Sequence, residues 1–589
     1  MNFVNLRHLL ETRAAETPDK TFLLAEADGR EWTYSEFDRI VNRTANLLLS
    51  HGIAKGDVVS LLMPNSPEYV AAYFACWKIG ATAGPVNSLL KPEEVEWVVT
   101  NSESKLILVG SDWSGERPAH YAVDNTGGNT TVRECVQGIP TLDFSSLETA
   151  TADFPDTLEA AALTTDHEAI IIYTSGTTGK PKGCLLTHGN LLANAEQITD
   201  WMGFGPEDRL LTIMPLFHMN AVTVTTMTAL VCGGSTVVSP KFSASRFWDI
   251  VERYQITSFG SVATMLSMLL GSGQSAVASG QTRSRHGPLT TDHRPLITSL
   301  RFAMCGSAPV PAEILKRFEE TFGVLVIEGY GLSESTCRST FNPPNENRRP
   351  GSCGQPIGNE MKVFDEEDNE VPVGEHGEIV LRGPNIFKAY FKNPEATAKA
   401  FANGWFHTGD IGYRDTDGFF YIADRKSDMI IRGGENIYPR EIDDLLYTHP
   451  AIATAAVIGV PDDLYGEEVA AFIVLKDGFT SGNSSVNERG DREGNDSPRG
   501  SRPSVSSPHV SKGASLPIAP APDTDEAETR PSGSVSNVTA QDIITFCKLH
   551  LADYKCPKTV HFVPDIPKGP TGKLLKRELA KLFAEARTT

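Results

Sequence analysis

The sequence lacks any hydrophobic run long enough to cross a membrane, because nowhere do about 18 apolar residues follow one another. Its N-terminal segment carries charged residues before any apolar stretch of signal-peptide length. Its last three residues, Arg587, Thr588 and Thr589, do not form the SKL peroxisomal signal. We therefore expect a cytoplasmic protein with no transmembrane segment.

Cysteine is scarce and basic residues are in the minority. The nine cysteines form no CxxC pair and no cluster with histidine at metal-ligand spacing, so we expect free thiols in a reducing compartment. The 53 Lys and Arg residues against 74 Asp and Glu give a formal net charge of -21. This balance disfavours nucleic acid as a partner, although local basic sites can still hold phosphates.

The chain is long and has enough apolar residues to form large hydrophobic cores. Its 589 residues, 40% hydrophobic and 22% charged, predict at least two or three globular units. From about residue 30 to 110, and again from about 168 to 340, helix-like stretches alternate with apolar runs such as VVSLLM, AIIIYTS and LVIEGYG. This order predicts layered α/β subdomains. After residue 350, the turn dipeptides Asn403-Gly404 and Asp417-Gly418 predict a β-rich subdomain.

The C-terminal part is interrupted between about residues 478 and 537 by a run dense in Ser, Gly, Pro, Asn and charge. Such a run cannot bury enough apolar surface to offset its conformational entropy, so we predict a disordered insertion, with phosphorylated docking as one role. Its flanks, AAFIVLKDG and TAQDIITFCKLHLADYKCP, predict a strand and then a helix. A shorter loop is predicted near residues 272–296.

The segment from Ile170 to Gly183 reads IIIYTSGTTGKPKG. Small residues let backbone amides approach phosphate oxygens, hydroxyls donate further hydrogen bonds, and lysine supplies the opposing charge. The pattern indicates a phosphate-binding loop. It is not a Walker A loop, because the first glycine would fall at Thr174 and Pro181 follows Lys180.

YTSGTTGKPKG resembles the signature of the adenylate-forming superfamily, which includes acyl-CoA synthetases, amino-acid adenylation domains and luciferases. Further matching segments follow in the family's order: Gly306-Ser307-Ala308-Pro309, EGYGLSE at 328–334, GWFHTGD at 404–410, YIADRKSDMIIRGGENIYPREID at 421–443 and PTGKLLKREL at 570–579. The resemblance implies a large N-terminal α/β lobe with a β-rich subdomain, residues 1–423, and a hinge at residues 424–428. A small mobile α+β C-terminal domain, residues 429–589, would follow.

The resemblance also implies the reaction. A carboxylic acid would attack ATP to form an acyl-adenylate and pyrophosphate, and the acyl group would pass to coenzyme A, with Mg²⁺ as the metal. Holding two anions together requires positioning and charge neutralisation. The residues that the resemblance assigns to ATP are Thr174, Ser175, Gly176, Thr177, Thr178, Gly179, Lys180, Lys182, Ser307, Ala308, Pro309, Glu328, Gly329, Tyr330, Gly331, Asp410 and Arg425.

Within this set the resemblance gives particular roles. Ser333 and Glu334 would lie at the α-phosphate and Mg²⁺, which prefers oxygen ligands. Asp410 and Arg425 would bind the ribose, and Tyr330 would offer its ring to adenine.

The C-terminal domain would act in turn on each half-reaction. Lys573 would contact the attacking carboxylate and the α-phosphate. Rotation about Ser427 would then replace it with a path for the thiol, lined by Arg432, Gly433, Gly434 and Glu435.

The acid itself stays open at this level. Amino-acid adenylation domains carry Asp directly after the Phe of their substrate motif, whereas this chain has Phe217-His218-Met219-Asn220, so an α-amino acid is not expected. His218 resembles the histidine that walls the acyl pocket of acyl- and aryl-CoA synthetases. Asn220 offers a partner for a polar group on the acid. An aliphatic or aryl acid is favoured by the adaptable apolar side chains of Met214, Met219, Val262, Met265 and Met304.

The acyl acceptor has two candidates. No carrier domain follows Thr589, so free coenzyme A is expected, with a separate carrier protein as the alternative. Two further hypotheses are a luciferase-like oxidation of the adenylate and a non-catalytic scaffold. The presence of Lys573, Glu334, Asp410 and Arg425 argues against a scaffold.

Overall fold

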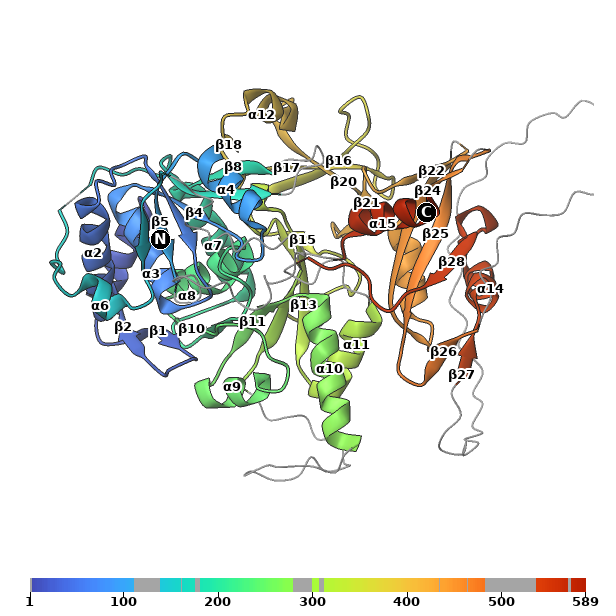
Figure 1. Ribbon diagram of the computed structural model, residues 1–589, viewed down its shortest axis with the longest axis horizontal. Coiled ribbons are helices and arrows are strands. Elements are labelled where there is room, and N and C mark those ends of the chain that lie inside the picture. The colour runs from blue at the N-terminus through green and yellow to red at the C-terminus, as the bar shows by residue number, and fades with distance from the viewer. Residues whose placement is uncertain are drawn as a thin grey trace, which may run out of the picture.

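The structure is a computed structural model that describes residues 3–110, 138–159, 161–174, 181–278, 299–306, 312–433, 435–462, 464–482, 536–569 and 574–588. Two large mixed sheets with helices form the N-terminal lobe (Figure 1). The nine-stranded sheet has the order β15 (Gln355–Pro356), β14 (Thr340–Phe341), β13 (Leu325–Tyr330), β12 (Phe302–Cys305), β11 (Ser258–Ser261), β9 (Arg209–Thr212), β10 (Ser235–Val238), β1 (Thr21–Ala25) and β2 (Glu31–Thr33). The seven-stranded sheet has the order β18 (Ala389–Tyr390), β8 (Lys182–Thr187), β7 (Glu168–Thr174), β4 (Thr82–Pro85), β3 (Val58–Leu62), β5 (Ser104–Val109) and β6 (Thr141–Asp143).

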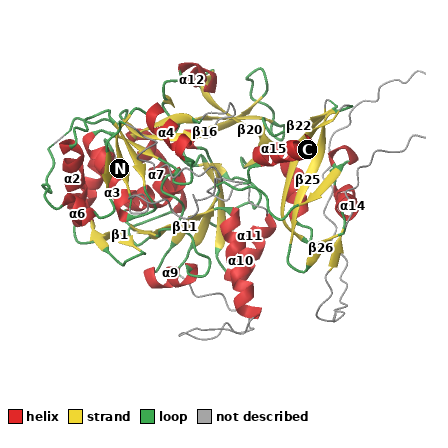
Figure 2. Cartoon of the chain, in the orientation of Figure 1, coloured by secondary structure: helices red, strands yellow, loops and turns green. Residues whose placement is uncertain are grey.

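Helices separate and cover these sheets (Figure 2). Helix α3 contacts β1 of one sheet and β3 and β4 of the other, so it lies between them. The helices of this lobe are α1 (Leu6–Glu16), α2 (Tyr34–Ser50), α3 (Pro67–Ile79), α4 (Pro92–Asn101), α6 (Leu147–Thr151), α7 (His188–Met202), the π-helix η3 (Asn220–Met227), α8 (Thr228–Cys232), α9 (Phe247–Tyr254), α10 (Ala263–Ala278), α11 (Ala312–Phe322) and the 3₁₀ turn η4 (Ser333–Ser335).

Local sequence explains where α2 and α3 begin and end. Thr33 and Glu36 form a capping box at the start of α2. Helix α3 begins after Ser66, which caps it, and ends at Gly80, whose φ of 75° suits glycine. Every residue of α3 is buried, as its place between two sheets requires.

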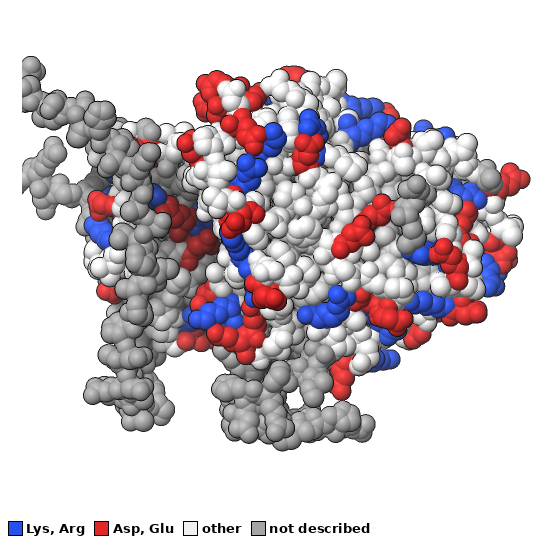
Figure 3. All heavy atoms as spheres, turned by 180° about the vertical axis from the view of Figure 1, so that it is seen from behind, with Lys and Arg blue, Asp and Glu red and all other residues white. Residues whose placement is uncertain are grey.

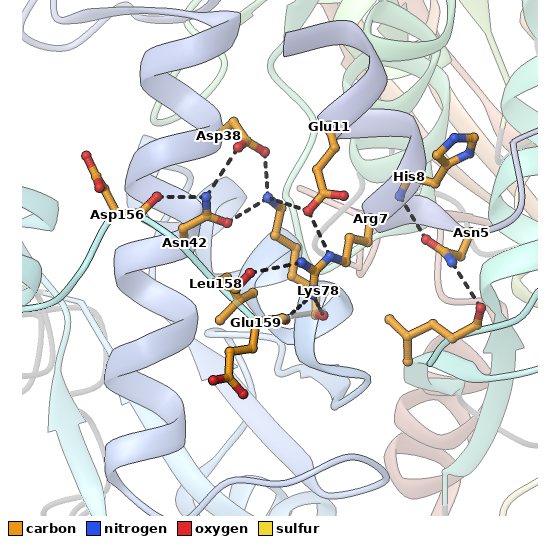
Figure 4. Close-up of polar contacts among 11 residues, drawn as sticks. Asn5, Arg7, His8, Glu11, Asp38, Asn42, Lys78, Asp156, Leu158 and Glu159 are labelled. Carbon is orange, nitrogen blue, oxygen red and sulfur yellow. Dashed lines mark hydrogen bonds and ion pairs between the residues drawn. The ribbon is translucent and has the colours of Figure 1, made fainter. Parts of the chain in front are cut away.

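Lys78 of α3 is the exception to an apolar interior, because its side chain is only 1% exposed. Its ammonium group lies 2.5 Å from Asp38 Oδ1 and 2.7 Å from Asn42 Oδ1, both on α2, and 3.4 Å from Glu11 Oε1 on α1 (Figure 4). Three helices therefore meet at one buried charge that has acceptors from two of them.

A smaller antiparallel sheet follows the two large ones. Asn403 and Gly404, with φ of 50° and 77°, form the tight turn between its strands β19 and β20, and both are in the left-handed region that such hairpins require. Its elements are β16 (Glu360–Phe364), β17 (Gly377–Arg382), β20 (Trp405–Arg414), β19 (Phe401–Ala402) and β21 (Phe420–Arg425), with α12 (Pro394–Ala400) beside it. The predicted β-rich subdomain is confirmed.

The C-terminal part, from β22 onward, has cores of its own (Figure 1, right). Alternate residues of β24 and β25 face α13 and α14 on one side and α15 on the other, so both faces of the sheet are covered. The elements are β22 (Ile430–Arg432), β23 (Glu435–Ile437), α13 (Pro439–Tyr447), β24 (Ile452–Asp462), β25 (Gly466–Leu475), β26 (Phe479–Ser481), β27 (Ser536–Val538), α14 (Ala540–His550), η5 (Asp553–Lys555), β28 (Thr559–Phe562) and α15 (Lys576–Thr588).

The two parts touch through α13. The Arg440 backbone N–H donates to Asp424 Oδ2 (3.0 Å), and its guanidinium donates to the Ile422 carbonyl (2.6 Å) on β21. Tyr438 stacks on His376 of the N-terminal lobe at 5.5 Å. The α/β fold class with a large N-terminal region and a smaller α+β C-terminal region is confirmed.

The structure confirms the predicted strands but only partly agrees with the predicted loops. The predicted strands at VVSLLM, AIIIYTS and LVIEGYG are confirmed as β3, β7 and β13. The loop predicted near 272–296 is wrong for residues 272–278, which continue α10 because that helix packs on α11 and tolerates its small residues. Residues 279–296 lie outside the described part of the chain.

The disordered insertion predicted for 478–537 falls mostly on residues 483–535, which also lie outside the described part. At its edges the prediction is wrong, since residues 479–481 and 536–538 pair as the parallel strands β26 and β27. Strand β25 before it and helix α14 after it confirm the predicted flanks.

Surface and composition agree with the sequence analysis where the chain is described. No described helix is both long and apolar enough to cross a membrane. The eight described cysteines are free. Seen from behind (Figure 3), acidic and basic side chains are interspersed, with no broad basic area among the described residues that this face displays.

Candidate active site

The predicted ribose residues lie side by side on a hairpin. Asp410 of β20 and Arg425 of β21 are directly paired in register, and Arg425 Nε lies 3.3 Å from Asp410 Oδ1. The Tyr330 hydroxyl, at the end of β13, donates to Asp410 Oδ2 at 2.6 Å. Residues about 80 positions apart in the chain thus meet at one buried carboxylate, which is 4% exposed.

A second contact joins Glu334 to Lys182, at the described end of the predicted phosphate loop. Glu334 lies in η4, just after β13, and is 9% exposed, so it is not a solvated carboxylate. The Tyr390 hydroxyl donates to Glu334 Oε1 at 2.9 Å. The Lys182 ammonium lies over the ring of the same tyrosine, 5.1 Å from its centroid.

These two groups belong to one electrostatic site. Burial raises the pKa of Glu334, and the Tyr390 hydrogen bond and the charge of Arg425 partly offset it, whereas the charge of Asp410 adds to it. Burial opposes the charge on Arg425, but Asp410 and the other acids nearby outweigh it and raise the pKa of the guanidinium. Lys182, Glu334, Asp410 and Arg425 therefore face a common region.

A strained turn comes directly after the short helix that carries Glu334. Thr336 has φ 65° and ψ -48°, and the Cys337 N–H donates to the Ser335 carbonyl at 2.8 Å, which makes a γ-turn of the rare positive-φ kind. The Thr336 hydroxyl donates to the Asn385 carbonyl at 2.7 Å and holds it. Strain held by its surroundings is typical of functional sites.

The strands explain how the loop is closed. Thr174 and Lys182 are directly opposite each other in the β7–β8 pair. Outside the described part of the chain lie the other predicted site residues Ser175, Gly176, Thr177, Thr178, Gly179, Lys180, Ser307, Ala308, Pro309, Gly434 and Lys573.

Glu328 is two residues before Tyr330 on β13, and its carboxylate accepts from the Gly351 backbone. Burial raises the pKa of Glu328 to about 8, partly offset by the Gly351 N–H, which donates to Oε2 at 3.0 Å. Gly329 and Gly331 flank Tyr330 where an added Cβ would collide with Phe341 and with the Cys337 carbonyl. The glycines are therefore required for packing around the tyrosine, whatever binds there.

His218 lies at the predicted acyl end. Burial lowers the pKa of His218 to about 4, so the imidazole is neutral at physiological pH. Its Nε2 has no hydrogen-bond partner among the described residues. The predicted apolar lining residues Met214, Met219, Val262, Met265 and Met304 are all buried.

The predicted hinge and thiol-path residues form a separate group. Ser427 is exposed, and its hydroxyl donates to Asp428 Oδ1 at 3.0 Å. Arg432 is held by Glu468 Oε1 at 2.6 Å and lies over the ring of Tyr465. Gly433 has φ 60° and starts the short turn that pairs Arg432 with Glu435.

The donor set suits magnesium better than zinc. Among the described residues no three His, Cys, Asp or Glu side chains are placed to hold a metal together. Mg²⁺ is commonly held by one or two carboxylates plus substrate phosphates and waters, and Glu334 supplies such an oxygen. The residues present therefore fit a Mg²⁺ that arrives with ATP.

Sequence reasoning missed Tyr390 and Thr336. The resemblance gives neither residue a role. Each acts through a partner that only folding brings close, Glu334 for Tyr390 and Asn385 for Thr336. Positive φ at a β-branched residue has no sequence signal.

Comparison with known proteins agrees with this geometry. The family model for AMP-binding enzymes matches residues 10–391, and that for the AMP-binding enzyme C-terminal domain matches residues 441–489. A sulfoacetate–CoA ligase from Cupriavidus necator is 32% identical over 98% of this chain and 97% of its own. The long-chain-fatty-acid–CoA ligase FadD13 from Mycobacterium tuberculosis is 31% identical over 98% and 99%.

A solved structure gives the same result in three dimensions. ATP-bound MatB from Rhodopseudomonas palustris superposes with a TM-score of 0.76 at 27% identity, covering 98% of this chain and 99% of MatB. The family models cover most of the chain, and these likenesses cover nearly all of it. The chain therefore belongs to the AMP-binding enzyme family, in its acyl-CoA and aryl-CoA ligase branch.

Proposed function

We propose that this acyl-CoA synthetase joins a carboxylic acid to coenzyme A in two steps. A carboxylate oxygen attacks the α-phosphorus of ATP and pyrophosphate leaves, which gives an acyl-adenylate. The coenzyme A sulfur then attacks the acyl carbon, AMP leaves, and the thiol proton passes to solvent. The supporting observation is that Asp410 pairs with Arg425 and that Tyr390 joins Glu334 to Lys182, with both carboxylates buried.

Each member of this region has a proposed task. Asp410 accepts from the ribose hydroxyls, and Arg425 holds the same sugar. Glu334 and Ser333 lie at the Mg²⁺ and the α-phosphate, and Tyr330 packs on adenine beside residues 307–309. The loop from Thr174 to Lys182 donates to the β- and γ-phosphates, so charge that grows as pyrophosphate leaves is neutralised in place.

The C-terminal domain supplies a different face to each step. In the proposed cycle, Lys573 contacts the α-phosphate during adenylation and departs when residues 429–589 rotate about the hinge at 424–428, with Ser427 as pivot. Arg432, Gly433, Gly434 and Glu435 then line the path of the thiol. The small α13 contact with Asp424 and Ile422 is compatible with such a rotation.

The acid is not settled by the relatives, because one acts on sulfoacetate and the other on a long-chain fatty acid by name. Neutral His218 and the buried methionines support an aliphatic or aryl body for the acyl group. Free coenzyme A is the proposed acceptor and a separate carrier protein the second candidate. Eight free thiols support the expected cytoplasmic location.

An acid panel tests the proposal directly. The purified chain is incubated with ATP, Mg²⁺, coenzyme A and single acids, and thioesters and AMP are read by mass spectrometry. We expect one chemical class of acid to give its CoA thioester with AMP in equal amount. AMP release that yields thioester only on a carrier protein supports the second candidate.

Lys573→Ala separates the half-reactions. This variant removes the charge that meets the α-phosphate, so we expect pyrophosphate exchange to fall at least about 100-fold. Thioester formation from synthetic acyl-AMP should be largely kept. Full pyrophosphate exchange in the variant contradicts the role given to the lysine.

A further inference from the structure

Arg338 is a buried charge for which the described residues offer no partner. It follows the γ-turn at Thr336 and is 1% exposed, one of the largest side chains in the interior. Its Nε and Nη2 have no hydrogen-bond partner among the described residues, and no described acid forms an ion pair with it. Its backbone, in contrast, is fixed by the Asn194 side chain at both N–H and C=O.

Such a group differs from the other interior arginine of this lobe. Arg13 is 8% exposed, and its guanidinium donates to Glu16 at 2.9 Å and to the Leu230 carbonyl at 3.2 Å. Arginine keeps its positive charge in proteins, and burying a charge without a partner costs several kcal/mol or more in general. An arginine held only for stability would have such acceptors, whereas one that binds a ligand receives them with the ligand.

The position of the guanidinium is fixed by glycine and aromatic neighbours. A Cβ on Gly306 would lie 2.7 Å from Nη2, so only glycine leaves room there. The guanidinium carbon also lies 5.5 Å from the centroid of the Phe341 ring. Arg338 is thus aimed at Gly306, just after the end of β12.

Asn220, the first residue of the π-helix η3, repeats the pattern against the neighbouring strand β11. It is 3% exposed, and neither its Oδ1 nor its Nδ2 has a partner among the described residues. A Cβ on Gly260 of β11 would lie 2.3 Å from that Oδ1.

The two orphan side chains share one face of the sheet. Gly260 pairs directly with Met304, and Gly306 comes two residues later, so both glycines are on one face by the alternation of a strand. The Gly306 N–H donates to the Ser261 carbonyl at 3.3 Å, which carries the pairing to that point. Asn220 and Arg338 therefore border the same end of the adjacent strands β11 and β12, and Asn220 follows His218 by two residues in the chain.

We propose that Arg338 binds a second acidic group, a carboxylate or a sulfonate, on the acid that the enzyme activates, with Asn220 as the neighbouring hydrogen-bond donor. This inference rests on the proposed function and names its substrate class. The planar guanidinium matches two oxygens of one anion, and a bidentate pair satisfies both of its orphan donors. The first carboxylate then remains free to attack ATP.

Matched acids that differ only at the far end test the proposal. Succinate and butanoate, and sulfoacetate and propanoate, are compared by kcat/KM in ATP–pyrophosphate exchange. A site with buried polar groups discriminates strongly against an analogue that leaves them unpaired. We expect the wild-type enzyme to prefer the doubly acidic member of a pair by about 100-fold or more.

Arg338→Met removes the charge and keeps a similar length. We expect kcat/KM for the doubly acidic substrate to fall about 100-fold, while that for its partner stays level or rises and KM for ATP is unchanged. Arg338→Lys should retain part of the preference. Asn220→Asp places a negative charge beside the second acidic group, so it should lower kcat/KM for the doubly acidic substrate alone. This variant replaces Arg338→Met as the test if Arg338→Met does not fold.

Arg301→Met is the matched control, because Arg301 pairs with Asp208 at 2.8 Å at the opposite end of β12. It should lower thermal stability and leave the acid preference intact. If Arg338→Met lowers kcat/KM equally for both acids, the proposal is overturned. A raised KM for ATP in this variant also overturns it and indicates that Arg338 binds a phosphate of the nucleotide. A wild-type enzyme that activates only acids without a second acidic group overturns this inference alone. One that activates no acid overturns the proposed function as well.

Discussion

At the scale of single residues, the hydrogen bond from Tyr390 decides when Glu334 is charged. Burial raises the pKa of Glu334 and this bond opposes the rise. Tyr390→Phe removes the bond but keeps the ring under Lys182. We expect the pKa of Glu334 to rise, so the carboxylate stays protonated to a higher pH and the acidic limb of the pyrophosphate-exchange profile moves upward. At neutral pH activity should fall about 10-fold.

Magnesium titration supplies the accompanying readout. If Glu334 binds the metal as proposed, the variant should need more Mg²⁺ at a pH of about 6 and approach the wild-type requirement at alkaline pH. An acidic limb that does not move, with activity lost equally at every pH, would show that Tyr390 acts only by packing.

How far the sequence leads at this scale depends on whether a residue's role is local. Asp410, Arg425 and Glu334 stand in segments whose order along the chain carries the resemblance, and the structure brings them together. Arg338 and Tyr390 acquire meaning only from what surrounds them. A single arginine or tyrosine in sequence gives no sign of burial or of an orphan donor.

At the scale of elements, the packing of α1, α2 and α3 depends on the Lys78 cluster. Asp38→Asn leaves the buried ammonium with weaker acceptors, since Glu11 is farther away at 3.4 Å. We expect a loss of about 2 kcal/mol in the stability of the N-terminal lobe, measured by chemical denaturation. Lys78→Met removes the buried charge itself and leaves acids that water reaches, so it should cost less.

The double variant distinguishes charge from shape. Asp38→Asn in the Lys78→Met background should cost far less than it does alone, because no buried charge remains to be left unpaired. Additive losses would mean that the cluster contributes through packing rather than through its charge.

Helices and strands differ in how well the sequence predicts them. Helix α3 has no amphipathic pattern, yet Ser66, Pro67 and Gly80 mark its ends. The π-helix at Asn220–Met227 is rich in β-branched residues, and the hydroxyls of Thr226 and Thr228 donate to backbone carbonyls five residues earlier and stabilise it. Tertiary burial and such side-chain bonds outweigh local propensity.

At the scale of the whole molecule, a chain of contacts links the N-terminal lobe to α15, the helix that follows Lys573 in the chain. Arg440 fastens α13 to β21, and Lys576 at the start of α15 lies 2.6 Å from Asp443 of α13. Burial raises the pKa of Asp443 to about 6, even though Lys576 opposes the rise. A partly buried ion pair therefore anchors the chain three residues after Lys573.

Lys576→Met should therefore uncouple the domain that it anchors. We expect pyrophosphate exchange to fall about 10-fold while thioester formation from synthetic acyl-AMP is kept, because in the proposed cycle only adenylation needs Lys573. Calorimetry should show a lower melting temperature for the C-terminal part alone, since its cores are separate. Equal loss in both half-reactions would contradict a purely positional role.

The parallel pair β26–β27 has a consequence for what this protein can carry. Phe479 pairs with Ser536 and Ser481 with Val538, and the Gly482 N–H donates to the Val538 carbonyl at 3.0 Å. Because the pair is parallel, the chain leaves after the end of β26 and re-enters at the start of β27, beside Phe479. Both ends of the intervening stretch are therefore fixed whatever its length, and each doubling of that length costs only about 0.6 kcal/mol. We therefore expect that an affinity tag or a fluorescent reporter can replace residues 483–535 between β26 and β27 without disturbing the rest of the fold.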